Sequence, residues 1–286
     1  FDLVGDFGAD STYIDLQLSI NPILVKMGAI NYLKDASFKF DAGIGANIEE
    51  DKYHFLQNKL SLNELELNFD GLVQLAENGK IITNAKFVTN KPSFKDLLSL
   101  IPAVYTKNFE DIETEGKLSL NGTLSGFYKD DVLPDLDLNL LVENAMISYP
   151  DFPKNIKDIN LGLQTYFNGE DKDKTVVNLE KFHWKLGENP FDASFKLRTP
   201  MSDPAIRGNL DGKIDLSTFA DVLPLEDTEL RGIIQSDISM KGKMSMIELE
   251  EYDKFKADGG IQLTDFYYSS SSVPVPVSIS NADLQF

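Results

Sequence analysis

Apolar and polar residues alternate along most of the chain with a period of two. Phe38 and Phe40, for example, flank Lys39. Because successive side chains of a β-strand point to opposite faces of a sheet, this alternation indicates strands with one buried and one solvated face. Several alternating runs are longer than ten residues, whereas strands usually have about five to six. The pattern therefore predicts a mainly β protein with a wide sheet.

The alternation slips by one residue at two places. One slip lies between Leu62 and Leu65, and the other lies between Leu179 and Phe182. A β-bulge or a tight turn would produce either slip, and the sequence leaves both explanations open. Residues typical of tight turns gather at 77–80, 168–171 and 202–204. Since most connections are short, neighbouring strands should pair in antiparallel order.

Helix is scarce in the pattern. Ser93, and later Ser217 or Thr218, can act as the N-cap of a short segment with apolar residues at helical spacing. A proline ends each segment, at Pro102 and at Pro224. We therefore expect two helices of about two turns each. They are either plugs at an edge of the sheet or ordinary connectors packed on the core.

These helical segments belong to a repeat of about 120 residues. The segment 94–102 returns at 219–224, and the segment 116–122 returns at 236–242. Such repeats typically build elongated proteins in which each repeat contacts its neighbours. We place the end of a preceding repeat at 1–29, two full repeats at 30–146 and 147–265, and the start of a further one at 266–286. We interpret the whole as one continuous elongated domain and a fragment of a longer protein.

A one-sided sheet of this size has to bury its apolar face against something. Two short helices are too small to cover it. The sheet either folds into a closed sandwich, in which case the face is an ordinary core, or curls into an open trough. A trough would accept acyl chains, because each buried CH₂ group contributes about 0.8 kcal/mol. The pattern of residues leaves both architectures open.

The composition restricts the classes of partner that the chain could bind. The 286 residues are 42% hydrophobic, which is enough for a large core, and the formal net charge is −19. That charge argues against a nucleic-acid partner and against docking on anionic lipid headgroups, since both require clustered Lys and Arg. The absence of Cys excludes disulfides and thiolate chemistry. No apolar run reaches the roughly 18 to 20 residues that a membrane-spanning helix needs.

The sequence contains few residues in the patterns that indicate catalysis or metal binding. His54 and His183 stand alone among apolar or aromatic neighbours, without the spacing of a metal site. The segment 122–126 places its serine one position too late for a hydrolase nucleophile elbow. The acidic segment 169–174 lacks the glycine and glutamate of a calcium loop, so a solvated hairpin tip is the simpler interpretation. We assign no catalytic residue, metal or cofactor, and expect the protein not to be an enzyme.

The long alternating strands, the segment 93–105 and the glycine-bounded segment 116–122 followed by Gly126 resemble the AsmA-like family, particularly its Bacteroidetes members. The resemblance covers nearly the whole chain. It implies a periplasmic envelope protein held in the inner membrane by a segment outside this chain. It also implies the curled, repeating β-groove architecture of TamB-like bridge proteins, which shield acyl chains during lipid transfer between membranes.

The resemblance gives the apolar strand positions a role. We expect the groove to bind phospholipid or another acyl lipid without catalysis, and other envelope proteins are possible partners. The alternative is a structural or assembly factor of the envelope with a closed β core and no lipid channel. We call the following residues the wall candidates: Phe38, Phe40, Leu65, Leu67, Phe69, Leu118, Leu120, Leu136, Leu138, Leu140, Leu161, Leu163, Phe195 and Leu197.

Overall fold

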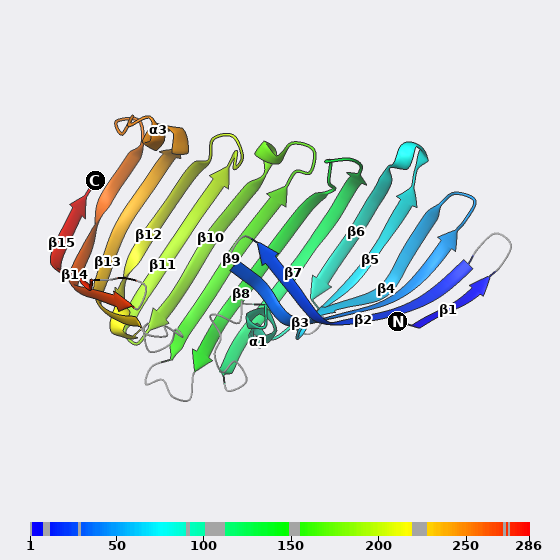
Figure 1. Cartoon of the computed structure of the whole chain (residues 1–286), viewed down its shortest axis with the longest axis horizontal. Coiled ribbons are helices and arrows are strands. Elements are labelled where there is room, and N and C mark those ends of the chain that lie inside the picture. The colour runs from blue at the N-terminus through cyan, green and yellow to red at the C-terminus, as the bar shows by residue number, and fades with distance from the viewer. Residues whose placement is uncertain are drawn as a thin grey trace. The chain divides into compact units, whose positions relative to one another are not determined.

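The protein is mainly β, as the alternation predicts. The structure is a computed structural model that describes residues 2–7, 12–27, 30–89, 92–100, 112–148, 155–218, 228–270, 273 and 275–286. Within these residues, fifteen strands form one sheet in the order β1 to β15 (Figure 1). Each strand thus neighbours the strands that precede and follow it in the chain. The antiparallel sheet of long strands confirms the expected fold class.

The strands are β1 (Asp2–Phe7), β2 (Thr12–Met27), β3 (Ile30–Asn47), β4 (Lys52–Leu62), β5 (Leu65–Leu75), β6 (Ile81–Thr89), β7 (Glu113–Tyr128), β8 (Asp135–Ser148), β9 (Ile156–Phe167), β10 (Val176–Leu186), β11 (Asn189–Arg198), β12 (Ala205–Asp215), β13 (Thr228–Lys243), β14 (Lys256–Ser270) and β15 (Val277–Gln285). The helices are α1 (Phe94–Leu98) and α3 (Met244–Glu248), with 3₁₀ turns η1 (Glu77–Gly79) and η4 (Lys172–Lys174). Strand β3 has 18 residues, three times the usual length of about six.

The two slips in the alternation have different causes. Leu62 and Leu65 pair directly across the tight turn between β4 and β5, where Asn63 has a φ of 52°. Asparagine tolerates this left-handed conformation better than most residues. The slip between Leu179 and Phe182 is a break in the register of β10 against β11, as a β-bulge produces. The sequence located both irregularities and the structure separates them.

Helix α1 begins where the sequence places it. The Ser93 hydroxyl accepts a hydrogen bond from the Asp96 backbone N–H at 3.2 Å, and the Asp96 carboxylate accepts one from the Ser93 backbone N–H at 2.8 Å. This capping box satisfies two backbone donors at the start of the helix. Phe94 and Leu98 are buried, so the short helix is held by its cap and by two apolar anchors.

The other helical segments differ from the prediction. Residues 216–218 are helical, and the Asp215 carboxylate accepts a hydrogen bond from the Ser217 backbone N–H at 3.1 Å. The expected N-cap at Ser217 or Thr218 is therefore wrong, because Asp215 caps the segment from the end of β12. The remainder of that predicted helix, 219–224, lies outside the described residues. Helix α3 was not predicted, and it contacts β13.

The order of elements bears on the repeat. Helix α1 follows β6, and the helical residues 216–218 follow β12, six strands later. Strands β7 and β13, which come next in each case, both have 16 residues. The boundaries 1–29, 30–146, 147–265 and 266–286 remain a prediction.

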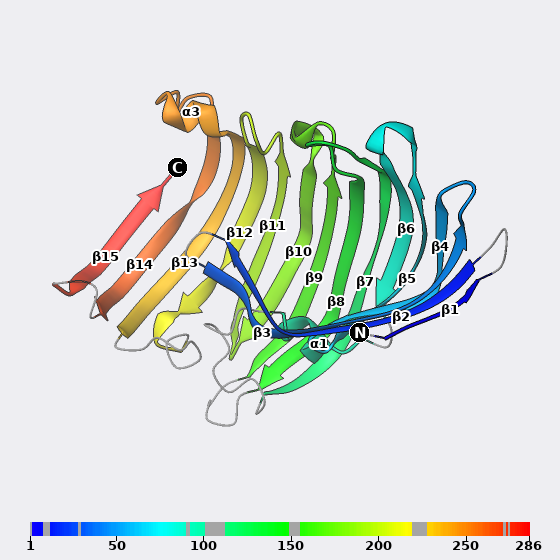
Figure 2. The same cartoon turned by 45° about the vertical axis from the view of Figure 1, so that its right-hand side comes forward.

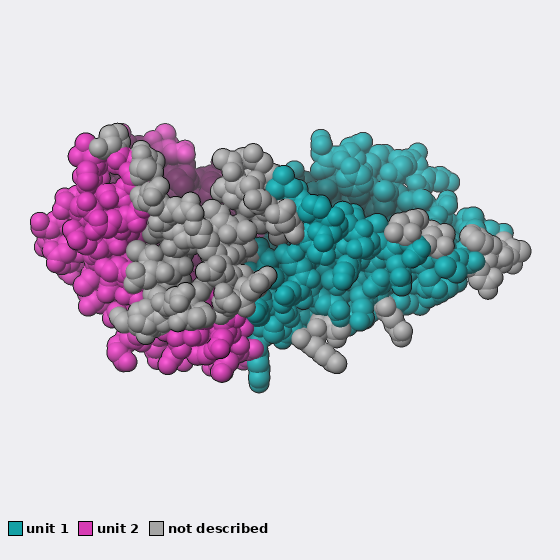
Figure 3. All heavy atoms as spheres, turned by 60° about the horizontal axis from the view of Figure 1, so that its bottom comes forward, with its two compact units in different colours: residues 1–103, 117–141, 164–175 teal, residues 104–116, 142–163, 176–286 magenta. Residues whose placement is uncertain are grey.

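The chain divides into two compact units, shown in Figure 3. Unit 1 comprises residues 1–103, 117–141 and 164–175, and unit 2 comprises residues 104–116, 142–163 and 176–286. Strands β1 to β6 therefore belong to unit 1, and β10 to β15 belong to unit 2. Figures 1 and 2 show that the strands of each unit curve along their length.

Much of the apolar material keeps contact with solvent. The accessible surface is 17661 Å², whereas a compact globular monomer of this mass would expose about 12,000 Å². Val142 and Asn58 are the largest side chains with less than 2% of their surface exposed. No described helix is long and apolar enough to cross a membrane. Few of the large side chains that the structure describes are thus fully buried.

Candidate functional site

The apolar side chains of unit 1 line up across neighbouring strands. Phe40 of β3 lies opposite Leu18 of β2 and Leu60 of β4, and Leu60 lies opposite Leu67 of β5. The row carries one apolar residue in each of four successive strands. We define the unit 1 apolar face as this row together with Ile20, Phe38, Leu62, Leu65, Phe69 and Phe87, which continue it on both sides.

Aromatic rings form the centre of this face. The rings of Phe40 and Phe69 are stacked, with centroids 5.4 Å apart and planes 18° apart. The Phe55 ring lies 6.0 Å from that of Phe69 at a tilt of 38°. Phe69 also pairs directly with Phe87 on β6. Such contacts fix the rings relative to one another, and each pair contributes about 0.5 to 1.5 kcal/mol beyond simple burial.

The side chains of the unit 1 apolar face pack against one another and keep part of their surface in contact with solvent. Phe40, Leu67 and Phe69 are only half-buried, although each lies in a row of apolar neighbours. Leu65, with 4% of its surface exposed, is an exception because it lies at the tight turn close to α1. Hydrocarbon groups therefore remain accessible along a surface that runs across β2 to β6.

A buried amide holds the backbone beneath this face. The Asn58 side chain is fully buried, and its Oδ1 accepts a hydrogen bond from the Gly43 backbone N–H at 2.7 Å. Its Nδ2 donates to the Phe69 carbonyl oxygen at 3.3 Å. The registers of β3 with β4 and of β4 with β5 both shift next to Asn58, so its side chain replaces hydrogen bonds that the bulges interrupt. Asn58 was not predicted from the sequence, although a polar residue between apolar positions was a usable signal.

Helix α1 lies at one end of the unit 1 apolar face. The Asn63 Nδ2 donates a hydrogen bond to the Ser99 carbonyl oxygen at 2.7 Å, which ties the turn between β4 and β5 to the end of the helix. This bond satisfies a carbonyl that the helix leaves unpaired at its C-terminus. The buried side chains of Phe94 and Leu98 anchor the helix. The helix therefore lies at the strand ends, next to the turn between β4 and β5.

Unit 2 has a related apolar face with smaller residues. Phe195 of β11 pairs with Gly208 of β12, and Gly208 pairs with Met240 of β13. Two residues along β11, Leu197 pairs with Ile206, and Ile206 pairs with Gly242. A Cβ atom on Gly242 would lie 2.2 Å from the Phe255 ring, so that ring occupies the space that a side chain would fill. Glycine thus alternates with large residues on the unit 2 apolar face.

The wall candidates fall into both units. Unit 1 contains Phe38, Phe40, Leu65, Leu67, Phe69, Leu118, Leu120, Leu136, Leu138 and Leu140, and unit 2 contains Leu161, Leu163, Phe195 and Leu197. The pairing register brings the five from β3 and β5 onto the unit 1 apolar face, and it places Phe195 and Leu197 on the unit 2 apolar face. Leu65 and Leu118 are buried, and the other twelve are half-buried. A role of these residues in lipid binding stays a prediction.

The two histidines occupy ordinary strand positions. His183 Nδ1 lies 2.8 Å from Asp192 Oδ1, its cross-strand partner on β11, and His54 lies exposed on β4. Among the residues that the structure describes, no group of three His, Asp or Glu side chains is arranged to hold a metal ion.

The start of α3 depends on a carboxylate from another part of the chain. Asp203, in the turn between β11 and β12, accepts hydrogen bonds from the Ser245 backbone N–H and from the Ser245 hydroxyl, both at 3.0 Å. It also lies 3.1 Å from the Lys243 ammonium. The Ser245 backbone bond, followed by the bonds from Lys243 and the Ser245 hydroxyl, lowers the pKa of Asp203 below its ordinary value of 3.8. Asp203 thus caps a helix that has no side-chain cap of its own.

Comparison with known proteins gives no relative from which a role could be transferred. No family model, no curated protein and no solved structure matches the chain. The function therefore has to be argued from the residues and surfaces described above.

Proposed function

We propose that this chain is a segment of a non-enzymatic β-groove that binds acyl chains and takes part in lipid transport or outer-membrane biogenesis between envelope membranes. The supporting observation is the unit 1 apolar face, a set of mostly half-buried apolar side chains, chiefly Phe and Leu, across β2 to β6. In this proposal the groove lies in the periplasm, and an inner-membrane anchor outside this chain holds it.

The chemistry of the face suits a hydrocarbon ligand. Its side chains offer dispersion contacts and no hydrogen bonds, so they would hold an acyl chain without selecting a headgroup. Each CH₂ group that leaves water for this face would contribute about 0.8 kcal/mol, so a chain of ten such groups would gain several kcal/mol after its ordering cost. A surface of this kind favours passage of many lipids over tight retention of one.

The half-buried state of Phe40, Leu67 and Phe69 favours the groove over a closed core. In a closed sandwich a second layer would cover such residues, and they would lose nearly all contact with solvent. The alternative, a structural or assembly factor without a lipid channel, therefore requires another protein to cover the face. Lipid binding by the isolated chain distinguishes the two proposals.

The test is uptake of a fluorescent fatty acid by the purified chain, together with native mass spectrometry of protein isolated from cells. We expect uptake by the unaltered chain and about a tenfold loss in L67D, because the new carboxylate would need to be desolvated beside the acyl chain. The matched control is L56D, the same change at a β4 residue with 63% of its surface exposed. It should retain uptake.

Two results would contradict the proposal. One is the absence of both fatty-acid uptake and co-purifying lipid in the unaltered chain. The other is equal loss of uptake in L67D and L56D while both variants remain folded by circular dichroism. If L67D unfolds, the milder L67N variant replaces it, because a neutral amide costs less to desolvate than a carboxylate.

A further inference from the structure

Four cationic side chains form one row across β11 to β14 in unit 2. The row lies on the face opposite to the unit 2 apolar face. Lys196 of β11 pairs with Arg207 of β12, Arg207 pairs with Lys241 of β13, and Lys241 pairs with Lys256 of β14. We call these four residues the cation row. They lie on the face opposite to Phe195 and its neighbours because successive side chains alternate between faces.

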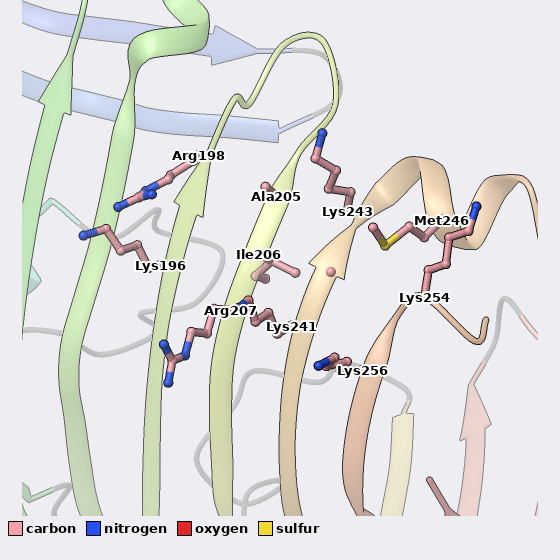
Figure 4. A pocket seen from close by; sticks show the side chains of 11 residues that line it. Lys196, Arg198, Ala205, Ile206, Arg207, Lys241, Lys243, Met246, Lys254 and Lys256 are labelled. Atoms are coloured by element: carbon pink, nitrogen blue, oxygen red, sulfur yellow. The ribbon is translucent and has the colours of Figure 1, made fainter. Parts of the chain in front are cut away.

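Three further cations surround the row. Arg198 and Lys243 lie on either side of Ala205, one step along the same face, and Lys254 precedes β14. All seven line a hollow of about 590 Å³, and Figure 4 shows their side chains around it. Ala205 and Met246 add apolar surface to the lining. The hollow therefore has apolar walls with positive charges gathered around it.

The protein leaves most of this charge unmatched. Lys243 lies 3.1 Å from Asp203, and Lys254 lies 2.7 Å from Glu251. For the four residues of the cation row and Arg198, the described part of the chain contains no ion pair within 4.0 Å. The next row along the sheet consists of Ser194, Asn209, Ser239 and Asp258, with a single carboxylate at its end. In a chain with 46 acidic residues, such a gap in the acidic surface calls for an explanation.

Like charges directly opposite each other destabilise a sheet. A row of four therefore lowers the stability of the free protein, and an anion bound across the row would remove that repulsion. Strands lie about 4.8 Å apart, so the row extends over about 14 Å. This length exceeds a single phosphate and fits several linked anionic groups.

We propose that the cation row and its hollow bind a multiply charged, phosphate-bearing anion. The guanidinium of Arg207 would bind phosphate oxygens in a bidentate manner, and the three lysines would provide point charges. The same chemistry occurs in phosphorylated lipid headgroups and in soluble polyphosphates, so the source is left to experiment. This site lies in unit 2, on the face of β11 to β14 opposite to Phe195 and Leu197, and it does not depend on the unit 1 apolar face.

The experiment is calorimetric titration of the full chain with inorganic tripolyphosphate at constant ionic strength, with sulfate as the control anion. The informative variant is K241E, which places a carboxylate between Arg207 and Lys256. Its matched control is K213E, the same change at an exposed residue of the same face, six residues from Arg207 along β12. We expect at least tenfold weaker binding in K241E and less than a twofold change in K213E.

A second measurement separates a binding site from general charge. At low salt and without ligand, K241E should melt at a higher temperature than the unaltered chain, because it converts two repulsions into attractions. Sedimentation with phosphatidylglycerol vesicles forms the lipid arm. Vesicle binding without tripolyphosphate binding identifies a headgroup as the ligand, and the reverse result identifies a soluble anion.

Several outcomes overturn the proposal. These are no binding in either arm, equal losses in K241E and K213E, and binding of sulfate as tightly as tripolyphosphate. Preference for double-stranded DNA over both probes would also overturn it. Fatty-acid uptake by K241E should equal that of the unaltered chain, so failure at this site and failure of the acyl-binding proposal give different results.

Discussion

The unit 1 apolar face and the cation row of unit 2 are built in the same way from different residues. In both, the antiparallel register places one residue of a kind from each of four successive strands side by side. In unit 1 these residues are Leu and Phe, and part of their hydrocarbon surface remains exposed. In unit 2 they are Lys and Arg, and their charge remains without counter-charge.

The difference teaches that one strand geometry can leave two kinds of surface unsatisfied. Rows of Leu and Phe gain stability from contact with each other and still gain more from an added hydrocarbon. Rows of Lys and Arg lose stability from contact with each other and recover it only from an anion. We therefore expect substitutions in unit 1 to lower stability and neutralising substitutions in the cation row to raise it.

The largest expected effect on stability is in unit 1. Replacing the fully buried Asn58 with alanine leaves the half-buried Gly43 backbone N–H without its partner. We expect a loss of about 2 kcal/mol in the free energy of unfolding, measured by urea denaturation, because an unpaired buried donor retains its desolvation cost. Acyl uptake should fall with it, since the bulged backbone beneath Phe69 is no longer fixed.

The control for this variant comes from unit 2. Asn209 also lies in a strand and donates from its side chain to Ser194, at 3.3 Å, but it is exposed. N209A should change the free energy of unfolding by less than about 0.5 kcal/mol, as surface substitutions usually do. Equal effects of N58A and N209A would refute the structural role given to the buried amide.

A smaller effect tests whether α1 matters to the apolar face. Changing Ser93 to alanine removes the hydroxyl that accepts from the Asp96 N–H. We expect about 1 kcal/mol less stability in thermal or urea unfolding, the usual cost of losing an N-cap. S125A, at an exposed position of β7, is the control and should be neutral. Hydrogen exchange should accelerate in α1 and at the turn that Asn63 ties to it, and unchanged exchange there would contradict the role of the cap.

The smallest expected effect is a pH dependence of stability that comes from Asp203, the carboxylate beside Lys243. The folded-state pKa of Asp203 lies below its ordinary value of 3.8, so the unfolded state binds its proton more readily. The stabilisation is therefore complete above about pH 5 and is lost as pH falls below 4 through the folded-state pKa. In D203N this part of the pH dependence should disappear. The measurement is the melting temperature between pH 3 and pH 7, and an identical slope in both proteins would contradict this assignment.

Periodicity made most of the fold predictable from sequence. The alternation at Phe38 and Phe40 was sufficient to predict a strand, because side chains that recur every two residues lie on the same face of a sheet. Ser93 was sufficient to predict the start of α1, because its capping partner Asp96 is only three residues later. In each of these cases the interaction that decides the structure is local, so a single stretch of sequence contains it.

Interactions between distant segments were not predictable in this way. The four residues of the cation row lie on four different strands. Without the register, nothing in the sequence indicates that Lys196 lies beside Arg207. The net charge of −19 even argued against an anionic ligand, because it averages over the whole chain. Helix α3 was not predicted for the same reason, since its cap comes from Asp203, 42 residues before Ser245.

The strand order also has a consequence for how the protein folds. Because every strand neighbours the strands next to it in the chain, a strand can dock as soon as its predecessor is in place. Contacts of short sequence separation keep the loop-closure entropy low, which makes a β protein fold faster than its class suggests. Growth from any early hairpin would then proceed in both directions, as in repeat proteins whose stability is a sum of local terms. During synthesis, such a sheet could assemble strand by strand without waiting for the rest of the chain.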